Sequence, residues 1–207
     1  MKGRLGSGAK GSLFFRNSLV CVQFVITICL VVSTMIINNQ LRFIRNRDAG
    51  FEREHIITTK VNRFNRELQE NIGVLKTELL KNPAIRAVTR SNWPPTNIRA
   101  GSSPTWEGLP EGERTLFHNL VTDYDFLDLF GIELVKGRAF SREITSDLTG
   151  AYLINETAAR IIGGEDVIGK EFGYSYRPGR IIGVVKDFNF VPVTVKIIPL
   201  AIRLDLD

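Results

Sequence analysis

The segment 164–170 of this 207-residue chain fits the pattern G-x-x-x-x-G-K, which in nucleotide-binding proteins surrounds phosphates with backbone N–H groups and a lysine. That chemistry also needs a Ser or Thr after the lysine to hold Mg²⁺, a strand before the loop and a helix that opens from it. Here Glu171 stands at the hydroxyl position, where its charge would repel phosphates, and the residues before the loop are typical of a helix. The sequence therefore predicts a structural turn and no nucleotide cofactor.

Three aspartates, Asp123, Asp125 and Asp128, form a second pattern that could bind a ligand, in this case a cation. A calcium loop needs further oxygen ligands, a glycine at its sharp turn and a distant glutamate, and the pattern lacks them. Acidic residues are also favoured at the start of a helix, where the macrodipole is positive. We therefore interpret 123–130 as a short helix with an acidic first turn.

Nucleophiles and metal ligands are scarce in this sequence. It holds two histidines, His55 and His118, each in a segment that alternates like a strand. Its two cysteines, Cys21 and Cys29, lie eight positions apart, which on a helix is about 12 Å by rise and excludes a disulfide between them. Because no cysteine follows Cys29 and no G-x-S-x-G motif occurs, the sequence predicts no catalytic residue, no metal site and no cofactor.

Residues 51–207 carry the mixture of patterns expected of one α+β domain. A β-branched run at 55–61, an amphipathic run at 65–82 and a second apolar run at 85–91 predict a β-α-β unit. The Pro-, Gly- and Ser-rich segment 92–112 predicts a loop or a small inserted subdomain. Further elements are predicted as strands at 114–122, 132–140, 151–154, 180–186 and 195–203, and as helices at 123–130 and 155–162, the latter capped by Asn155.

An uncharged run of 25 residues, 17–41, precedes this domain. About 20 apolar residues in a helix cross a hydrocarbon layer of about 30 Å, so the run predicts a transmembrane helix. A cleavable signal peptide has a shorter apolar region and a small-residue cleavage site, and a buried soluble helix is rarely apolar on all sides for so long. We assign 1–16 to a basic cytoplasmic leader and 17–44 to the transmembrane helix.

The net charge of +5 comes mainly from the leader, because residues 1–16 carry four basic residues and no acid, whereas residues 48–207 carry 20 basic and 22 acidic residues. Nucleic-acid binding needs basic residues gathered on a folded face, and this distribution argues against it. Basic residues flank the helix equally on both sides. Since long folded segments translocate largely regardless of charge, we predict that the residues after about 48 lie outside the cytoplasm.

Four polar residues in the predicted span, Gln23, Thr27, Thr34 and Asn38, are spaced by 4, 7 and 4 positions. At about 100° per residue they fall within a sector of about 60° on one side of the helix. Polar side chains in hydrocarbon often bond to a neighbouring helix, whereas threonine hydroxyls also bond to the backbone of their own helix. The polar stripe thus predicts either a helix–helix interface or threonines bonded within one helix.

A series of short motifs extends in order over about 17–203. The motifs are Leu19-Val20, Gln23-Phe24, Ile26-Thr27, Gln40-Leu41, Gly50-Phe51, Gly137-Arg138-Ala139-Phe140, Ile154-Asn155-Glu156, Ile168-Gly169-Lys170, the run 180–190 and Ile198-Pro199-Leu200. Together they resemble the first helix and the MacB-like periplasmic core domain of FtsX-type ABC-transporter permeases.

The resemblance implies an extracytoplasmic domain, 51–207, with a porter-like part and an inserted subdomain at about 92–121. It implies no catalysis by this chain, because in the family a separate cytoplasmic ABC ATPase hydrolyses ATP. A dimer of permease copies or homologous halves then transmits the motion across the bacterial inner membrane. Family members act in efflux of drugs or toxins, in lipoprotein or peptide handling, or in transmembrane signalling to cell-wall enzymes.

Family members continue into three more membrane helices after the core domain, whereas this sequence ends at Asp207. The favoured function is therefore that of a permease subunit fragment, from the first or second repeat of a longer permease. The alternative is a single-span sensor or ligand-binding protein. That alternative predicts an apolar pocket with convergent polar groups in the extracytoplasmic domain.

Overall fold

The computed structural model describes residues 8–46, 50–52, 54–61, 71–164, 166–191 and 195–206, which belong to two compact units, Met1–Arg47 and Asp48–Asp207. Within the first unit, the described residues form one helix of 39 residues, α1 (Gly8–Asn46). Its segment Phe14–Phe43 is long and apolar enough to cross a membrane, and its apolar side chains are exposed. The predicted apolar helix is therefore present and is a candidate membrane span.

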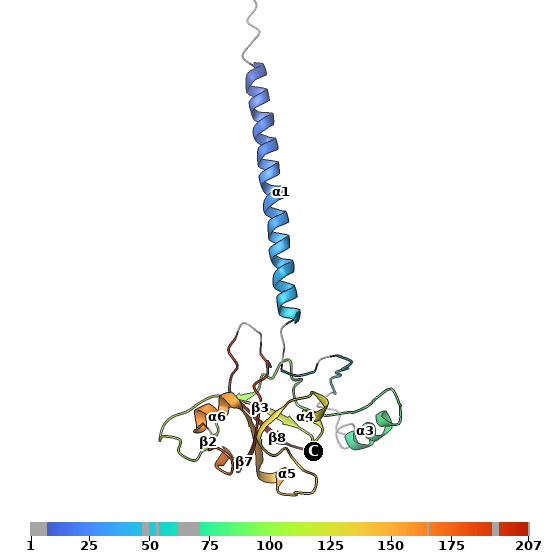
Figure 1. The fold of residues 1–207 in the computed structure, drawn as a ribbon, viewed down its shortest axis with the longest axis vertical. Coiled ribbons are helices and arrows are strands. Elements are labelled where there is room, and N and C mark those ends of the chain that lie inside the picture. Colours follow the sequence, from blue (N-terminus) through green and yellow to red (C-terminus); the bar gives the residue numbers. More distant parts are fainter. Residues whose placement is uncertain are drawn as a thin grey trace, which may run out of the picture. The chain divides into compact units, whose positions relative to one another are not determined.

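A mixed sheet forms the centre of the second unit, with short helices around it (Figure 1). Its strands follow the order β1-β3-β8-β5-β7-β6-β2, and β4 pairs with β7 beside this path. Two pairs, β3 with β8 and β5 with β7, are parallel, and the others are antiparallel. The strands are β1 (Gly101–Ser102), β2 (Thr105–Trp106), β3 (Phe117–Thr122), β4 (Leu134–Gly137), β5 (Ala151–Asn155), β6 (Glu171–Tyr174), β7 (Arg177–Val185) and β8 (Leu200–Leu204).

The sheet is strongly curled. Its two outermost strands, β1 and β2, lie at opposite ends of the strand order but are joined by only Ser103 and Pro104. Two residues bridge little more than 10 Å, so the two edges must come close together. The ring of Trp106 on β2 accordingly lies 5.6 Å from the ring of Phe117 on β3.

Each face of the sheet contributes to its own apolar cluster. Along β5, Leu153 faces one cluster while Tyr152 and Ile154 face the other, which is the alternation expected of a strand. All five residues of β5 are buried, as expected for a strand covered on both faces. The first cluster is covered by α4 (Phe126–Leu129) and the loops around it, and the second by α6 (Glu156–Ile162).

Helix α6 begins where the sequence predicts it, because Asn155 caps its first turn. The Asn155 Oδ1 accepts a hydrogen bond from the Ala158 N–H at 3.0 Å. The same oxygen accepts the Leu200 N–H at 2.9 Å, and Nδ2 donates to the Ile198 carbonyl at 3.0 Å. Asn155 is fully buried, so one side chain fixes both the start of α6 and the entry into β8.

The predicted β-α-β unit at 55–91 is wrong in its strands. Residues 54–55 form a turn with His55 at a positive φ of 61°, residues 56–61 have no regular structure, and Ile57 is 96% exposed. The segment 85–91 contributes only an isolated bridge between Ser91 and Thr122. A β-branched run becomes a strand only where a partner lies beside it, and the described part of the chain supplies none here.

Other boundaries differ from the prediction more mildly. Of the helix predicted at 65–82, α3 (Ile72–Leu80) is present, whereas 62–70 lies outside the described residues. Strand β6 and helix α5 (Asp147–Gly150) were not predicted, and β7 starts earlier than predicted. Within 92–121, β1, β2 and most of β3 join the main sheet, and the bounds of an inserted subdomain stay a prediction.

Candidate functional site

The near-match to a phosphate-binding loop lies in a turn between α6 and β6. The Lys170 N–H bonds to the Val167 carbonyl at 3.3 Å, and the Gly169 N–H bonds to the Ile181 carbonyl at 2.8 Å. The loop leads into a strand rather than into a helix, so no helix N-terminus is available for phosphate. This arrangement supports the prediction of a structural turn.

The aspartates at 123 and 125 form an ion-pair cluster with a basic residue from α3. The Lys76 ammonium donates to Asp123 Oδ2 at 2.8 Å and also to Asp125. Arg142 donates to both oxygens of Asp125 at 3.0 and 2.9 Å. Asp123 also accepts from the Thr89 hydroxyl and from the Arg90 N–H. The carboxylates are therefore already satisfied by protein donors, and they act as an attachment rather than as a cation loop.

Proton affinities in this cluster follow from its charges. Burial alone would lower the pKa of Lys76, but the hydrogen bonds and charges of Asp123 and Asp125 outweigh it and raise the pKa. Burial alone would raise the pKa of Asp125, but Lys76 and Arg142 lower it below its usual value. Lys76 and Asp125 therefore both remain charged at neutral pH. The predicted short helix is present as α4, with Asp128 in its first turn, whereas Asp123 and Asp125 lie before it.

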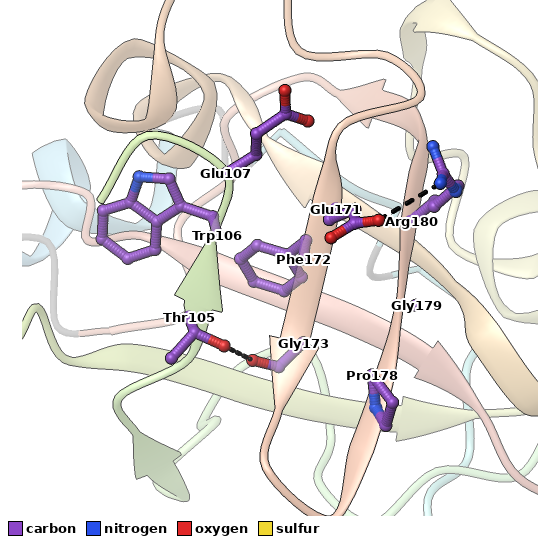
Figure 2. Close-up of a pocket in the computed structure, with 9 residues that line it drawn as sticks. All are labelled: Thr105, Trp106, Glu107, Glu171, Phe172, Gly173, Pro178, Gly179 and Arg180. Carbon is purple, nitrogen blue, oxygen red and sulfur yellow. Dashed lines mark hydrogen bonds and ion pairs between the residues drawn. The ribbon is translucent and has the colours of Figure 1, made fainter. Parts of the chain in front are cut away.

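An open groove of about 520 Å³ lies along β2, β6 and the start of β7 (Figure 2). Trp106 and Phe172 pair across β2 and β6 and form its apolar part. Of its three charged residues, Glu107, Glu171 and Arg180, the last two pair with each other at 3.3 Å and are 71% and 63% exposed, and Glu107 is exposed as well. The groove is therefore open and its charged groups face water, whereas a small-molecule site requires convergent polar groups around an enclosed apolar space.

The predicted helix-interface residues all lie on α1. Thr27 donates its hydroxyl proton to the Gln23 carbonyl and Thr34 to the Leu30 carbonyl, both at 2.8 Å. These bonds match the interpretation in which threonines bond within their own helix. Each hydroxyl oxygen keeps lone pairs that can accept a bond from another helix, so the interface along the polar stripe stays a prediction.

The first described residues after α1, Gly50, Phe51 and Glu52, attach to the core of the domain; we call them the Gly50–Glu52 clasp. The Phe51 ring meets the rings of Phe130 and Phe188 edge to face, at 6.2 and 6.0 Å. The Glu52 N–H donates to the Phe130 carbonyl at 2.8 Å. The clasp therefore combines a ring contact with a backbone bond at the start of the domain.

Asp187, next to Phe188, ties the same region to α6. Its carboxylate accepts the Thr157 N–H at 2.9 Å, the Thr157 hydroxyl at 2.7 Å and the Arg160 guanidinium at 2.9 Å. In return, Glu156 accepts the Asp187 N–H at 2.9 Å. The bond to Asp187 satisfies the Thr157 N–H, which lies in the first turn of α6 and has no partner within the helix.

Among the described residues, no group of three or more His, Cys, Asp or Glu side chains is arranged to hold a metal. The chain thus combines a candidate transmembrane helix with a domain built on a curled mixed sheet, which places it in the class of membrane-anchored α+β domains. The sequence model of the MacB-like periplasmic core domain matches residues 20–201, most of the chain. The chain therefore belongs to the MacB-like periplasmic core domain family.

Three solved structures are similar to part of this chain. Each match covers 63% of this chain: a domain assigned to a permease of Porphyromonas gingivalis (25% identity, TM-score 0.46), the periplasmic region of MacB from Actinobacillus actinomycetemcomitans (17%, 0.43) and the extracellular domain of the ABC-type transporter YknZ from Gram-positive bacteria (19%, 0.42). The matches span 55%, 54% and 60% of those chains, respectively. No curated protein matches the chain.

The sequence did not indicate the ion-pair cluster as an attachment, and it indicated no packing partner for Phe51. The Lys76 bond to Asp123 joins residues 47 positions apart, and no local pattern encodes such a distance. A pointer to the clasp was present in the Gly50-Phe51 motif, because a large aromatic side chain at the start of a domain is a natural candidate for packing against its core.

Proposed function

We propose that this chain is part of a permease subunit of a MacB/FtsX-type ABC transporter. It would couple ATP hydrolysis by a separate cytoplasmic ATPase to motion of a periplasmic domain, and would perform no catalysis itself. The observation that carries the proposal is the continuous family match over 20–201, which includes both the apolar helix and the curled domain. Efflux, lipoprotein or peptide handling, and transmembrane signalling are the roles that this coupling would serve.

In this proposal α1 crosses the bacterial inner membrane, with the basic leader in the cytoplasm and the residues after about 48 outside it. The 30-residue segment Phe14–Phe43 is about 45 Å long as a helix, enough to cross the hydrocarbon layer and reach both interfaces. Basic residues flank the helix equally on both sides, so the proposed orientation rests on the long folded segment that follows it, which translocates largely regardless of charge.

The permease function requires α1 to contact helices of a second permease copy or homologous half. We propose that Gln23, Thr27, Thr34 and Asn38 form this contact. The native cysteines offer a test, because at about 100° per residue Cys21 and Cys29 lie more than about 90° away from the polar stripe. The two faces of α1 can therefore be compared by the same crosslinking chemistry.

For this test, Thr34→Cys is made with Cys21 and Cys29 replaced by serine, and the full chain is oxidised in lipid bilayers. Rapid crosslinking through position 34 with slow crosslinking of the native cysteines is the expected result. If the native cysteines crosslink faster, or position 34 does not crosslink at all, the helices do not meet along the polar stripe.

Coupling to an ATPase is tested by purifying the protein from its native membrane in mild detergent. We expect an ABC ATPase to copurify and to show vanadate-sensitive ATP hydrolysis. Recovery of a monomer without ATPase activity would contradict the permease function and favour the alternative, a single-span sensor or ligand-binding protein. For that alternative, the groove at Trp106 and Phe172 is the place to look for ligand.

A further inference from the structure

Three polar atoms are buried in the curled sheet without a hydrogen-bond partner. Among the residues that the structure describes, the buried side-chain atoms of this kind are Asn119 Oδ1, the Tyr174 hydroxyl and Arg203 Nε, and Tyr174 is only 3% exposed. Burial of a polar group without a partner costs free energy, so such a group points to a ligand or an ordered water molecule. We propose that these three side chains bind a small carboxylate that carries an O–H or N–H group on the neighbouring carbon atom.

All three side chains lie on the inner face of the curled sheet. On a strand, residues two positions apart face the same side. The residues two positions before the three side chains all belong to the apolar cluster that α6 covers; they are Phe117, Phe172 and Ala201. On this face Trp106 meets Phe117 across the two edges of the sheet, which makes it the inside of the curl. The three atoms therefore face a common interior.

Strand register brings these side chains together. The pairing of β3 with β8 makes Asn119 and Arg203 diagonal neighbours, whose Cβ atoms lie about 8 Å apart, within reach of an arginine side chain. Arg203 pairs with Tyr152 on β5, and the Tyr152 ring lies 6.2 Å from the Tyr174 ring. Burial raises the pKa of Tyr174, and the Ser102 hydroxyl and the charge of Arg203 act against that rise. Ser102 is thus near the Tyr174 hydroxyl, although no hydrogen bond of normal geometry joins them.

A cavity of about 410 Å³ lies beside this group of side chains. It is lined by Leu148, Thr149, Arg177, Asp205 and Leu206. Two of these lining residues contact the proposed site. Arg177 pairs with Tyr174 across β6 and β7, and the Asp205 carboxylate accepts a bond from Arg203 Nη1 at 2.8 Å. A ligand that enters the cavity therefore meets the residues directly beside Tyr174 and Arg203.

The charges and hydrogen-bonding groups select the class of ligand. Two arginines, Arg177 and Arg203, share the single carboxylate of Asp205, at 3.6 and 2.8 Å. These three side chains carry one excess positive charge, which suits a monovalent carboxylate better than a divalent phosphate. Arg203 Nε and the Tyr174 hydroxyl can both donate to that carboxylate. Asn119 Oδ1 only accepts, so it needs an O–H or N–H group on the ligand, which a 2-hydroxy or 2-amino acid supplies.

The test measures the thermal unfolding midpoint of the full chain in detergent, with chloride at equal ionic strength as the baseline. Glycolate and glycine are the probes, and acetate is the matched compound without the second donor. Because a ligand that binds the folded state stabilises it by mass action, we expect a rise of about 3 °C or more at about ten times the Kd. A rise with glycolate alone assigns a hydroxy acid to the site, and a rise with glycine alone assigns an amino acid.

Tyr174→Phe removes one donor to the carboxylate and should abolish the rise. Tyr176→Phe is the matched control, because it makes the same chemical change at a side chain that is 68% exposed, and it should retain the rise. Asn119→Ala should reduce the response to glycolate to that of acetate. Without ligand, Tyr174→Phe should not lower the midpoint, because the hydroxyl that it removes has no partner in the protein.

Several results would overturn the inference. No rise with either probe, or a rise that survives Tyr174→Phe, would show that these side chains do not bind a carboxylate. An equal rise with acetate would refute the role of the second donor. A lower midpoint of Tyr174→Phe without ligand would assign the three atoms to ordered water. The outcome is separate from that of the permease function, because carboxylate binding without a copurifying ATPase would support the site and refute the ATPase coupling.

Discussion

Replacing Lys76 with methionine should release α3 from the domain while leaving the core folded. None of the nine residues of α3 is buried, so the helix gains little from apolar burial. Among the side-chain bonds of the described residues, those of Lys76 to Asp123 and Asp125 join α3 to the rest of the domain. Methionine keeps most of the apolar stem and removes the ammonium group.

The expected effect follows from the exposure of the partners. The Lys76 side chain is 24% exposed and that of Asp123 is 9% exposed, so their bond is largely shielded from water. A hydrogen bond to a charged group contributes about 1.5–3 kcal/mol. Asp125 is 33% exposed and keeps Arg142, so the second bond adds little. The attachment of α3 should weaken by about 2–3 kcal/mol, which corresponds to roughly 30- to 140-fold faster local opening.

Hydrogen exchange of the peptide 71–81 measures this opening directly. Lys81→Met is the matched control, because Lys81 pairs with Glu78 inside α3 and both side chains are well exposed, at 67% and 57%. That pair should contribute at most about 1 kcal/mol, and its loss should change exchange only a few-fold. Amides of the central strand β5 should be unchanged in both variants.

An exchange rate for Lys76→Met within a few-fold of the wild type would refute this reasoning. It would show that α3 is held by contacts other than the ion-pair cluster. Equal acceleration in both variants would refute it as well, because the control leaves the bonds to Asp123 and Asp125 in place.

Three further predictions concern single side chains of the domain. Asp147 is buried and paired with Arg138 through two bonds of 2.7 Å; burial would raise its pKa, but Arg138 and the Ser141 N–H lower it below 3.8. The charged Asp147 therefore stabilises the fold fully above that pH, and this stabilisation is lost as the pH falls below it. In urea unfolding, the loss of unfolding free energy caused by Asp147→Asn should become smaller between neutral pH and about pH 3. A loss that stays constant with pH would contradict this prediction. Gly137→Ala should lower the free energy of unfolding by about 3 kcal/mol or more, because φ is +77° and a Cβ would lie 2.3 Å from a carbonyl oxygen. Gly108→Ala, with φ at +90° and open space around the Cβ, should lower it by only about 1–2 kcal/mol. Equal shifts of the thermal unfolding midpoint in the two variants would exclude the clash at Gly137. Asn155→Ala should lower the free energy of unfolding by about 3 kcal/mol, because three buried hydrogen bonds are lost. Asn155→Asp keeps the acceptor oxygen and should recover part of that free energy. If Asn155→Asp is as unstable as Asn155→Ala, the bond donated by the Asn155 amide dominates.

Local sequence patterns predicted the elements whose apolar side chains are buried in the two clusters of the sheet. The strands β3, β5, β7 and β8 and the helix α6 were all predicted, because their apolar residues are dictated by burial against the sheet clusters. The same reasoning failed at 55–61, where the β-branched residues find no partner strand in the described chain. It also missed β1 and β2, whose two residues each are too short to carry a period.

The candidate site was less accessible to prediction because its contacts are non-local. The Gly50–Phe51 motif was visible, but its role depends on Phe130 and Phe188, which are brought beside it only by the folded sheet. Lys76 likewise looked like an ordinary polar position of an amphipathic helix. Composition and periodicity identify what must be buried, and they do not identify which distant partner will bury it.

The position of β8 in the sheet has a consequence for how the domain is made. It lies between β3 and β5, yet it follows both of them in the sequence, as well as β7 and β6. Until residues 200–204 are available, the sheet consists of two separate pieces, and the edges of β3 and β5 expose unpaired backbone N–H and C=O groups. Contacts of such long range form slowly, because loop closure precedes any gain from pairing. In the proposed orientation, a chain of this topology would complete its core only after residues 200–204 have crossed the membrane.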